Sequence, residues 1–151
     1  MKFADKTKMM FVAAFTALNG WLGCLAVPFY FLLLTNLIDY TTGIVASVCR
    51  GEKVSSNTGF RGIAKKVCMW LLVLVGYIID YIFAQLGTAM NITVGFSSLV
   101  ALAVIFWLMA NELISILENI SDVGVPMPAF LLKLAQFVKD KTEETVTIGE
   151  K

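Results

Sequence analysis

Residues 67–111 read VCMWLLVLVGYIIDYIFAQLGTAMNITVGFSSLVALAVIFWLMAN, a run of 45 residues in which Asp80 is the single charged side chain. A helix rises about 1.5 Å per residue, so about 20 apolar residues cross the ~30 Å hydrocarbon core of a membrane. The run is long enough for two crossings, and the uncharged turn from Gly87 to Ile92 is where we expect the chain to reverse. We therefore predict one membrane helix at 67–86 and another at 93–110.

A second apolar block, residues 9–49, precedes this run and contains one charged side chain, Asp39. As a single helix it would be about 60 Å long, roughly two bilayers, so we expect it to fold back on itself. Gly and Pro interrupt helices, and the predicted breaks are Asn19-Gly20 and Val27-Pro28. These breaks place helices at 9–25 and 28–49. Because Trp21 fits poorly beside a lipoprotein cleavage site, we expect the first helix to be retained.

The fold class that follows is all-α: an integral membrane protein with three to four transmembrane helices, of which we favour four. If residues 9–25 only lie in the membrane interface, the chain has three crossings, and its N-terminus and C-terminus lie on opposite sides of the membrane. The composition agrees, because 58% of the 151 residues are hydrophobic and 15% are charged, against about 25% charged in a soluble domain. We find no repeat and predict a single membrane domain, 1–151.

The composition also argues against catalysis and cofactors. The chain has no histidine, and its three cysteines lack the spacing of zinc ligands. Asp39 and Asp80 could be imagined as the acid–base pair of an intramembrane protease, but neither lies in a recognisable catalytic motif. We therefore predict no enzyme activity, no metal, no cofactor and no nucleic-acid partner.

Basic residues set the predicted orientation. The segment 50–66 carries Arg50, Lys53, Arg61, Lys65 and Lys66, whereas the turn 87–92 has no basic residue. By the positive-inside rule, 50–66 is a cytoplasmic loop and 87–92 is external. The C-terminal region, 111–151, then lies in the cytoplasm.

The C-terminal region is predicted to begin as a continuation of the last membrane helix. Glu112, Ser115 and Asn119 share one face at spacings of three and four residues. Gly124 is the expected end of this helix, and the two prolines that follow, Pro126 and Pro128, delay the next one. From Ala129 to Lys141 apolar residues recur at helical spacing, which predicts an amphipathic helix on the membrane surface or against the loop.

The two membrane aspartates are the most informative residues, since no Lys or Arg lies inside a predicted span to pair with them. A charged Asp at the centre of a lone helix costs several kcal/mol, so each must face other helices or water, or be protonated. Both lie on stripes of small and polar residues, a pattern that lets helices approach closely. We hypothesise that these stripes form an oligomerisation or pore face; the alternative is that they only pack helices within one chain. Their members are Thr35, Asn36, Asp39, Thr42, Gly43 and Ala46, and Gly76 and Asp80.

An ordered set of motifs between Leu37 and Leu134 resembles the toxin-secretion/phage-lysis holin family. The first part is Asp39-x-x-x-Gly43-x-x-Ala46, followed by Lys53, Ser55, Ser56, Gly59, Gly62, Lys65 and Lys66. Asp80 stands where that family has an Asp in the next span. The C-terminal part comprises Glu112, Ser115, Glu118, Asn119, Gly124, Pro126 and Pro128. Met127 departs from the family, which more usually has Val or Ile there.

The resemblance implies a holin encoded by a bacteriophage or a prophage-derived toxin locus. Such proteins are multi-pass proteins of the bacterial cytoplasmic membrane that form homo-oligomers. They open large lesions that release an endolysin for host cell lysis, or a toxin for secretion, without binding it directly. The alternative reading of the residues is a small ion channel, transporter subunit or membrane scaffold. Dye release separates these functions, since a holin passes molecules of protein size.

Overall fold

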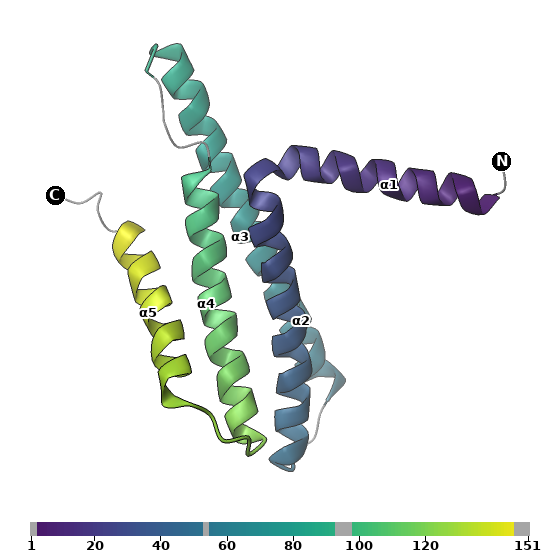
Figure 1. The fold of residues 1–151 in the computed structure, drawn as a ribbon, viewed down its shortest axis with the longest axis vertical. Helices are drawn as coiled ribbons and strands as arrows, with labels where there is room; N and C mark the ends of the chain where they lie inside the picture. The colour runs from purple at the N-terminus through teal and green to yellow at the C-terminus, as the bar shows by residue number, and fades with distance from the viewer. Residues whose placement is uncertain (1–2, 53–54, 93–97, 147–151) are drawn as a thin grey trace.

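The computed structural model describes residues 3–52, 55–92 and 98–146. In these residues the regular structure is entirely helical, which confirms the predicted all-α class. The elements are α1 (Phe3–Leu22), the short 3-10 helix η1 (Gly23–Leu25), α2 (Ala26–Cys49), α3 (Ser56–Ala89), α4 (Leu99–Asp122) and α5 (Ala129–Val146). Figure 1 shows α4 in the middle, with α2, α3 and α5 packed along it and α1 projecting sideways.

Within the described ranges, three helical segments are long and apolar enough to cross a membrane: Asp5–Cys49, Gly59–Ala89 and Leu99–Asp122. The first contains both α1 and α2, which meet at a bend. The sequence favours four crossings within the range of three to four, whereas the described residues contain three candidate segments. That α1 makes a crossing of its own stays a prediction.

The bend between α1 and α2 lies at Gly23, which has a φ of +53°. Both predicted break points were wrong. Asn19 stays in α1, where its side-chain amide donates to the Phe15 carbonyl (2.8 Å), and Pro28 lies in the first turn of α2, where a missing N–H is tolerated. Glycine adopts a left-handed conformation without steric cost, which explains why the chain turns at Gly23.

The α3 helix is longer than its predicted span. It begins at Ser56, so most of the predicted loop 50–66 is helical. Two glycines of this segment face Tyr40 on α2: a Cβ at Gly59 would lie 3.3 Å from the Tyr40 hydroxyl, and one at Gly62 would lie 3.7 Å from its ring. The Tyr40 side chain thus lies over the start of α3, at two positions that have no side chain of their own.

Three helices end in the same way, with a left-handed residue after the last turn. Gly51, Asn91 and Gly124 have positive φ, and the next residue's N–H donates back to a carbonyl near the helix end, as from Val125 to Ile120 (3.3 Å). Gly124 as the end of α4 is therefore confirmed. A turn does follow α3, but the predicted bounds 87–92 were wrong at the start, because the helix continues to Ala89. The predicted start of the last span at Thr93 lies outside the described residues.

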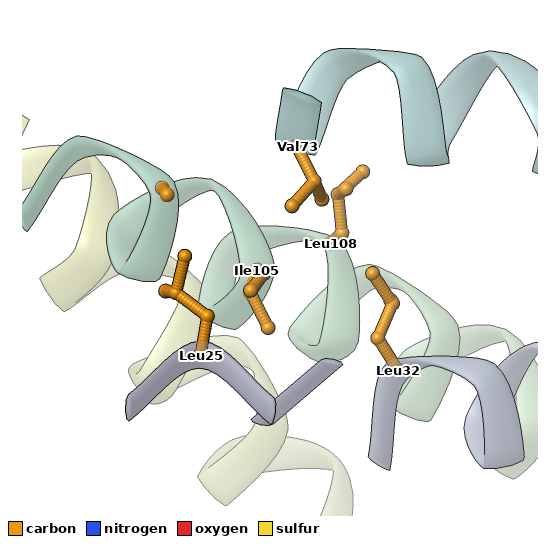
Figure 2. Packing of buried hydrophobic residues seen from close by; sticks show 6 residues of the cluster. Leu25, Leu32, Val73, Ile105 and Leu108 are labelled. Carbon is orange, nitrogen blue, oxygen red and sulfur yellow. The ribbon is translucent and has the colours of Figure 1, made fainter. Parts of the chain in front are cut away.

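The packing core is small and sits at one end of the bundle. Leu25, Leu32, Val73, Ile105 and Leu108 form a buried cluster contributed by η1, α2, α3 and α4 (Figure 2). Large apolar side chains elsewhere point outward; Phe11, for example, is 72% exposed. A surface of this kind suits hydrocarbon. We call the opposite end, where α2 ends and α3 begins, the basic end.

Candidate functional site: an ion network between three helices

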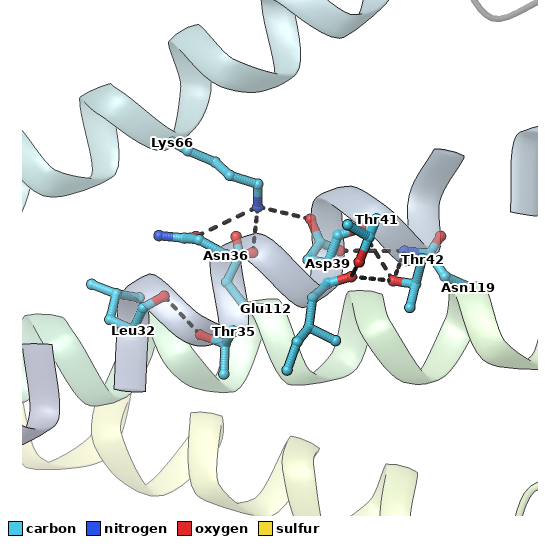
Figure 3. A network of polar contacts seen from close by, with 10 residues as sticks. Leu32, Thr35, Asn36, Asp39, Thr41, Thr42, Lys66, Glu112 and Asn119 are labelled. Carbon is cyan, nitrogen blue, oxygen red and sulfur yellow. Dashed lines mark hydrogen bonds and ion pairs between the residues drawn. The ribbon is translucent and has the colours of Figure 1, made fainter. Parts of the chain in front are cut away.

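Lys66 is the centre of a polar network inside the bundle (Figure 3). Its Nζ atom lies 2.8 Å from Oδ2 of Asp39 on α2 and 2.5 Å from Oε2 of Glu112 on α4. It also donates to Oδ1 of Asn36 at 3.5 Å. The side chains of Lys66, Asp39 and Glu112 are 13%, 17% and 4% exposed. One lysine thus joins all three helices.

The three charged groups form one layer. Each lies ten residues from its helix's end at the basic end: Asp39 from Cys49, Lys66 from Ser56, and Glu112 from Asp122. Ten residues correspond to about 15 Å of helix. The layer is therefore deep in the bundle, and its formal charge is −1, from two carboxylates and one ammonium.

This layer corrects the expectation that Asp39 lacks a basic partner. The basic residues of 50–66 predict a cytoplasmic loop by the positive-inside rule, and Lys66 is the last of them. The structure places it on the inner face of the extended α3 helix. A lysine has a long apolar stem, so its ammonium group can reach a carboxylate on a neighbouring helix.

Asn119 is a second hydrogen-bond donor to Asp39. Its Nδ2 atom donates to Oδ1 of Asp39 and to Oγ1 of Thr42, both at 3.3 Å. Both oxygens of the Asp39 carboxylate are therefore hydrogen-bonded, as buried charges require. Asn36 is less well satisfied, since its Nδ2 is buried with no hydrogen-bond partner among the described residues.

A cavity of about 420 Å³ extends from this network toward the basic end, between α2, α3 and α4. Gly43 helps to make the space: a Cβ there would meet Asn119 Nδ2 at 3.6 Å. Many of the residues that carry the resemblance to holins line this cavity. The motif residues that line the cavity are Asp39, Gly43, Gly59, Gly62, Lys65, Lys66, Glu112, Ser115 and Asn119.

Arg50 lines the cavity at the basic end. Its guanidinium pairs with Glu52 (2.9 Å from Nε to Oε1) and with Asp122, which ties the end of α2 to the end of α4. The hydrogen bond from Arg50 lowers the pKa of the Glu52 carboxyl. Nothing in the spacing of these residues had indicated this cluster, because it depends on where both helices end.

Asp80 has a different partner from Asp39. Its carboxylate accepts the backbone N–H groups of Val100 (3.0 Å) and Ala101 (2.8 Å), in the first turn of α4. The positive end of the helix dipole favours an anion there. One turn earlier, a Cβ at Gly76 would lie 3.0 Å from the Ala101 Cα. Gly76 and Asp80 therefore position the start of α4 against α3.

The remaining predicted residues fall into two groups. Thr35 and Ala46 are buried on α2, and the Thr35 hydroxyl donates to the Leu32 carbonyl (3.0 Å) of its own helix. The other group lies on the surface or in connections: Ser55, Ser56, Glu118, Gly124, Pro126 and Pro128. Lys53 lies outside the described residues. The stripes thus make contacts within the chain, and contact with a second copy stays a prediction.

Together, these features define a class: a multi-pass membrane protein whose apolar helices enclose a charged, partly open interior. Residues 16–140 match the bacteriophage holin family. The chain belongs to this family.

Among curated proteins, the chain is 36% identical over 134 residues to an uncharacterized protein of Listeria monocytogenes, covering 88% of this chain and 87% of the relative. It is 36% identical over 129 residues to an uncharacterized 14.9 kDa protein of Clostridium perfringens encoded in the nagH 3′ region, covering 85% and 87%. A protein of Bacillus phage phi105 with the name "Probable holin" is 25% identical over 113 residues, covering 75% of each chain. No solved structure matches.

Proposed function

We propose that the protein is a holin of the bacterial cytoplasmic membrane, which forms homo-oligomers and opens lesions large enough to release an endolysin, or a toxin, from the cell. Membership of the holin family supports the role. The observation that carries the mechanism is the Lys66 network, a charged layer enclosed by helices whose outer surface is apolar.

Such a bundle suits two environments. With α2, α3 and α4 closed, Lys66 neutralises one of the two carboxylate charges, and the outer surface is compatible with lipid. Separating the helices in lipid would strand buried charges at a cost of about 3–5 kcal/mol for a broken pair. In an assembly with an aqueous lumen, hydration of Asp39, Lys66 and Glu112 would offset much of that cost. The charged layer thus favours a closed single chain and permits a wet, open assembly.

A fixed narrow channel is less compatible with this interior. The cavity extends from the basic end to the ion network, and the buried cluster of Leu25, Leu32, Ile105 and their neighbours fills the other end of the bundle. A continuous path through one chain would require this apolar cluster to separate. We therefore propose that permeation follows assembly and rearrangement.

Expression in bacteria tests the function. The chain alone should abolish membrane potential and viability at a defined time after induction, and co-expressed endolysin should then lyse the cells. Loss of potential without access of the endolysin to the cell wall would indicate a small channel and contradict the proposal.

Two substitutions in the Asp39 stripe separate packing from charge. Gly43→Leu inserts bulk where even a Cβ lies 3.6 Å from Asn119 of the same chain, so it separates α2 from α4, and we expect the altered helix face to prevent oligomers. Asp39→Asn keeps the shape and removes the charge, so oligomers should persist while the timing or extent of lysis changes. If crosslinking and lysis of both variants match the parent, the stripe serves only packing within the chain.

A further inference from the structure

The cavity between α2, α3 and α4 has a negatively charged floor. That floor is the Lys66 layer, in which two carboxylates meet one ammonium group (Figure 3). Nearer the basic end, the positive charges of Arg50 and Lys65, which line the cavity, offset two negative ones. These belong to Glu52 and Asp122, the partners of Arg50. The excess charge of −1 therefore lies at the floor.

Glu112 has one carboxylate oxygen without a protein partner at this floor. Its side chain is 4% exposed, and its Oε2 atom accepts from Lys66. Among the described residues, none donates a hydrogen bond to the other oxygen, Oε1. Both oxygens of Asp39, by contrast, accept hydrogen bonds. A buried carboxylate oxygen needs a donor, water or a cation, and Glu112 lines the cavity, from which such a partner can reach it.

The cavity suits water and a small cation. Its volume of about 420 Å³ has room for many water molecules. Ser47, Asn111 and Ser115 line it, and their hydroxyl and amide oxygens are of the kind that hard cations prefer. The described residues contain no group of three His, Cys, Asp or Glu side chains that could hold a metal ion. The lining therefore suits one hydrated positive charge better than a tightly coordinated metal ion.

The polar path ends at the floor. One turn beyond Glu112, α4 carries Leu108, which is 2% exposed and belongs to the buried apolar cluster. Leu32 of the same cluster is 0% exposed on α2. A cation that enters from the basic end can thus reach Glu112 but cannot pass through the closed chain.

We propose that the cavity binds a small monovalent cation from the cytoplasm, and that Glu112 is the group that attracts it. The site belongs to the closed single chain, so it goes beyond the proposed function and does not require a lesion. It rests on the predicted orientation, which places the basic end in the cytoplasm. The cation would neutralise the excess charge of the Lys66 layer, which is costly at that depth in a membrane.

Cysteine modification in inverted membrane vesicles, whose cytoplasmic face is outside, tests the proposal. The native cysteines, all exposed, are first replaced by serine, and Ser115→Cys then places a thiol of similar size in the cavity. Two membrane-impermeant methanethiosulfonate reagents are compared, one with a trimethylammonium group and one with a sulfonate group. Each rate is divided by the rate of the same reagent with a free thiol in solution. The control is Leu113→Cys, which is exposed on α4 outside the cavity lining.

The cationic reagent should modify Ser115→Cys at least about tenfold faster than the anionic one, after normalisation. The reason is that Ser115 lies one turn from Glu112, about 5–6 Å between Cβ atoms, where a net negative charge attracts one reagent and repels the other. Leu113→Cys, in lipid, should react with neither. Glu112→Gln should remove the preference. Asp39→Asn also neutralises the floor and should do the same, so the test does not depend on the folding of one variant.

Three results would overturn the proposal. Equal normalised rates at Ser115→Cys would show a cavity that holds water without preferring cations. No reaction with either reagent would show that the cytoplasm does not reach the cavity. A preference that survives both Glu112→Gln and Asp39→Asn would assign the attraction to another group. None of these results depends on lysis, so a chain that lyses cells without a cation preference would leave the proposed function standing.

Discussion

Replacing Lys66 with methionine tests whether the ion network holds the closed bundle together. Methionine keeps much of the side-chain volume but removes the charge. It leaves Asp39 and Glu112, which are 17% and 4% exposed, as unpaired carboxylates in one layer. Removing one partner of a buried pair costs about 3–5 kcal/mol, because an uncompensated buried charge remains. We therefore expect Lys66→Met to lower the free energy of unfolding by that amount.

Glu112→Gln is the matched comparison. The remaining Lys66–Asp39 pair is electrically neutral, and the new amide oxygen can still accept a hydrogen bond from Lys66. We expect the free energy of unfolding to fall by about 1 kcal/mol, which is the difference in strength between a hydrogen bond to a charged group and one to a neutral group. The triple variant with Asp39→Asn, Lys66→Met and Glu112→Gln should recover to within about 2 kcal/mol of the parent, since it has no stranded charge.

Unfolding by SDS titration in mild detergent micelles, followed by tryptophan fluorescence, measures these differences. Lys133→Met, at an exposed position on α5, is the control for loss of a lysine. The network does not stabilise the bundle if the free energies of unfolding of Lys66→Met and Lys133→Met differ by less than about 0.5 kcal/mol. The same conclusion follows if the triple variant is as unstable as Lys66→Met. In cells, a weakened network should make lysis earlier.

Three further outcomes follow from the structure. Asp80→Asn should destabilise the chain by about 1–2 kcal/mol, because a neutral amide is a weaker acceptor for the first-turn N–H groups of α4; unchanged SDS unfolding would contradict this. External labelling of intact cells should reach Asn91→Cys and miss Ser56→Cys in the cysteine-free chain, and the reverse pattern would invert the orientation. Truncation after Pro128 should leave a chain that still inserts and kills, at a changed time; loss of both would make α5 essential.

The long apolar runs predict the fold class because crossing a membrane depends mainly on local length and composition. They do not predict the bend at Gly23, since Gly20 and Pro28 carry similar local signals and tertiary packing decides among them. The start of α3 at Ser56 was also missed. Its polar residues resemble a loop, and the contact of Gly59 with Tyr40 of another helix cannot be read from local sequence.

The candidate site was predicted only in part for the same reason. Asp39, Asn119 and their neighbours could be selected from composition and from the holin motifs, but their mutual contacts require three helix registers at once. The pairing of Lys66 with Asp39 would have been visible if α3 had been extended to Ser56, which puts both residues ten positions from a helix end. Asp80 offered no such signal, because its partners are backbone N–H groups.

Whether the chain opens lesions of protein size is tested most directly with purified protein in liposomes loaded with both a small fluorescent dye and a folded reporter protein. Once the chain has assembled, we expect dye and reporter protein to be released together, because the lesion forms between many copies. Release of the dye alone, with the reporter protein retained at every protein-to-lipid ratio, would contradict it and indicate a narrow channel.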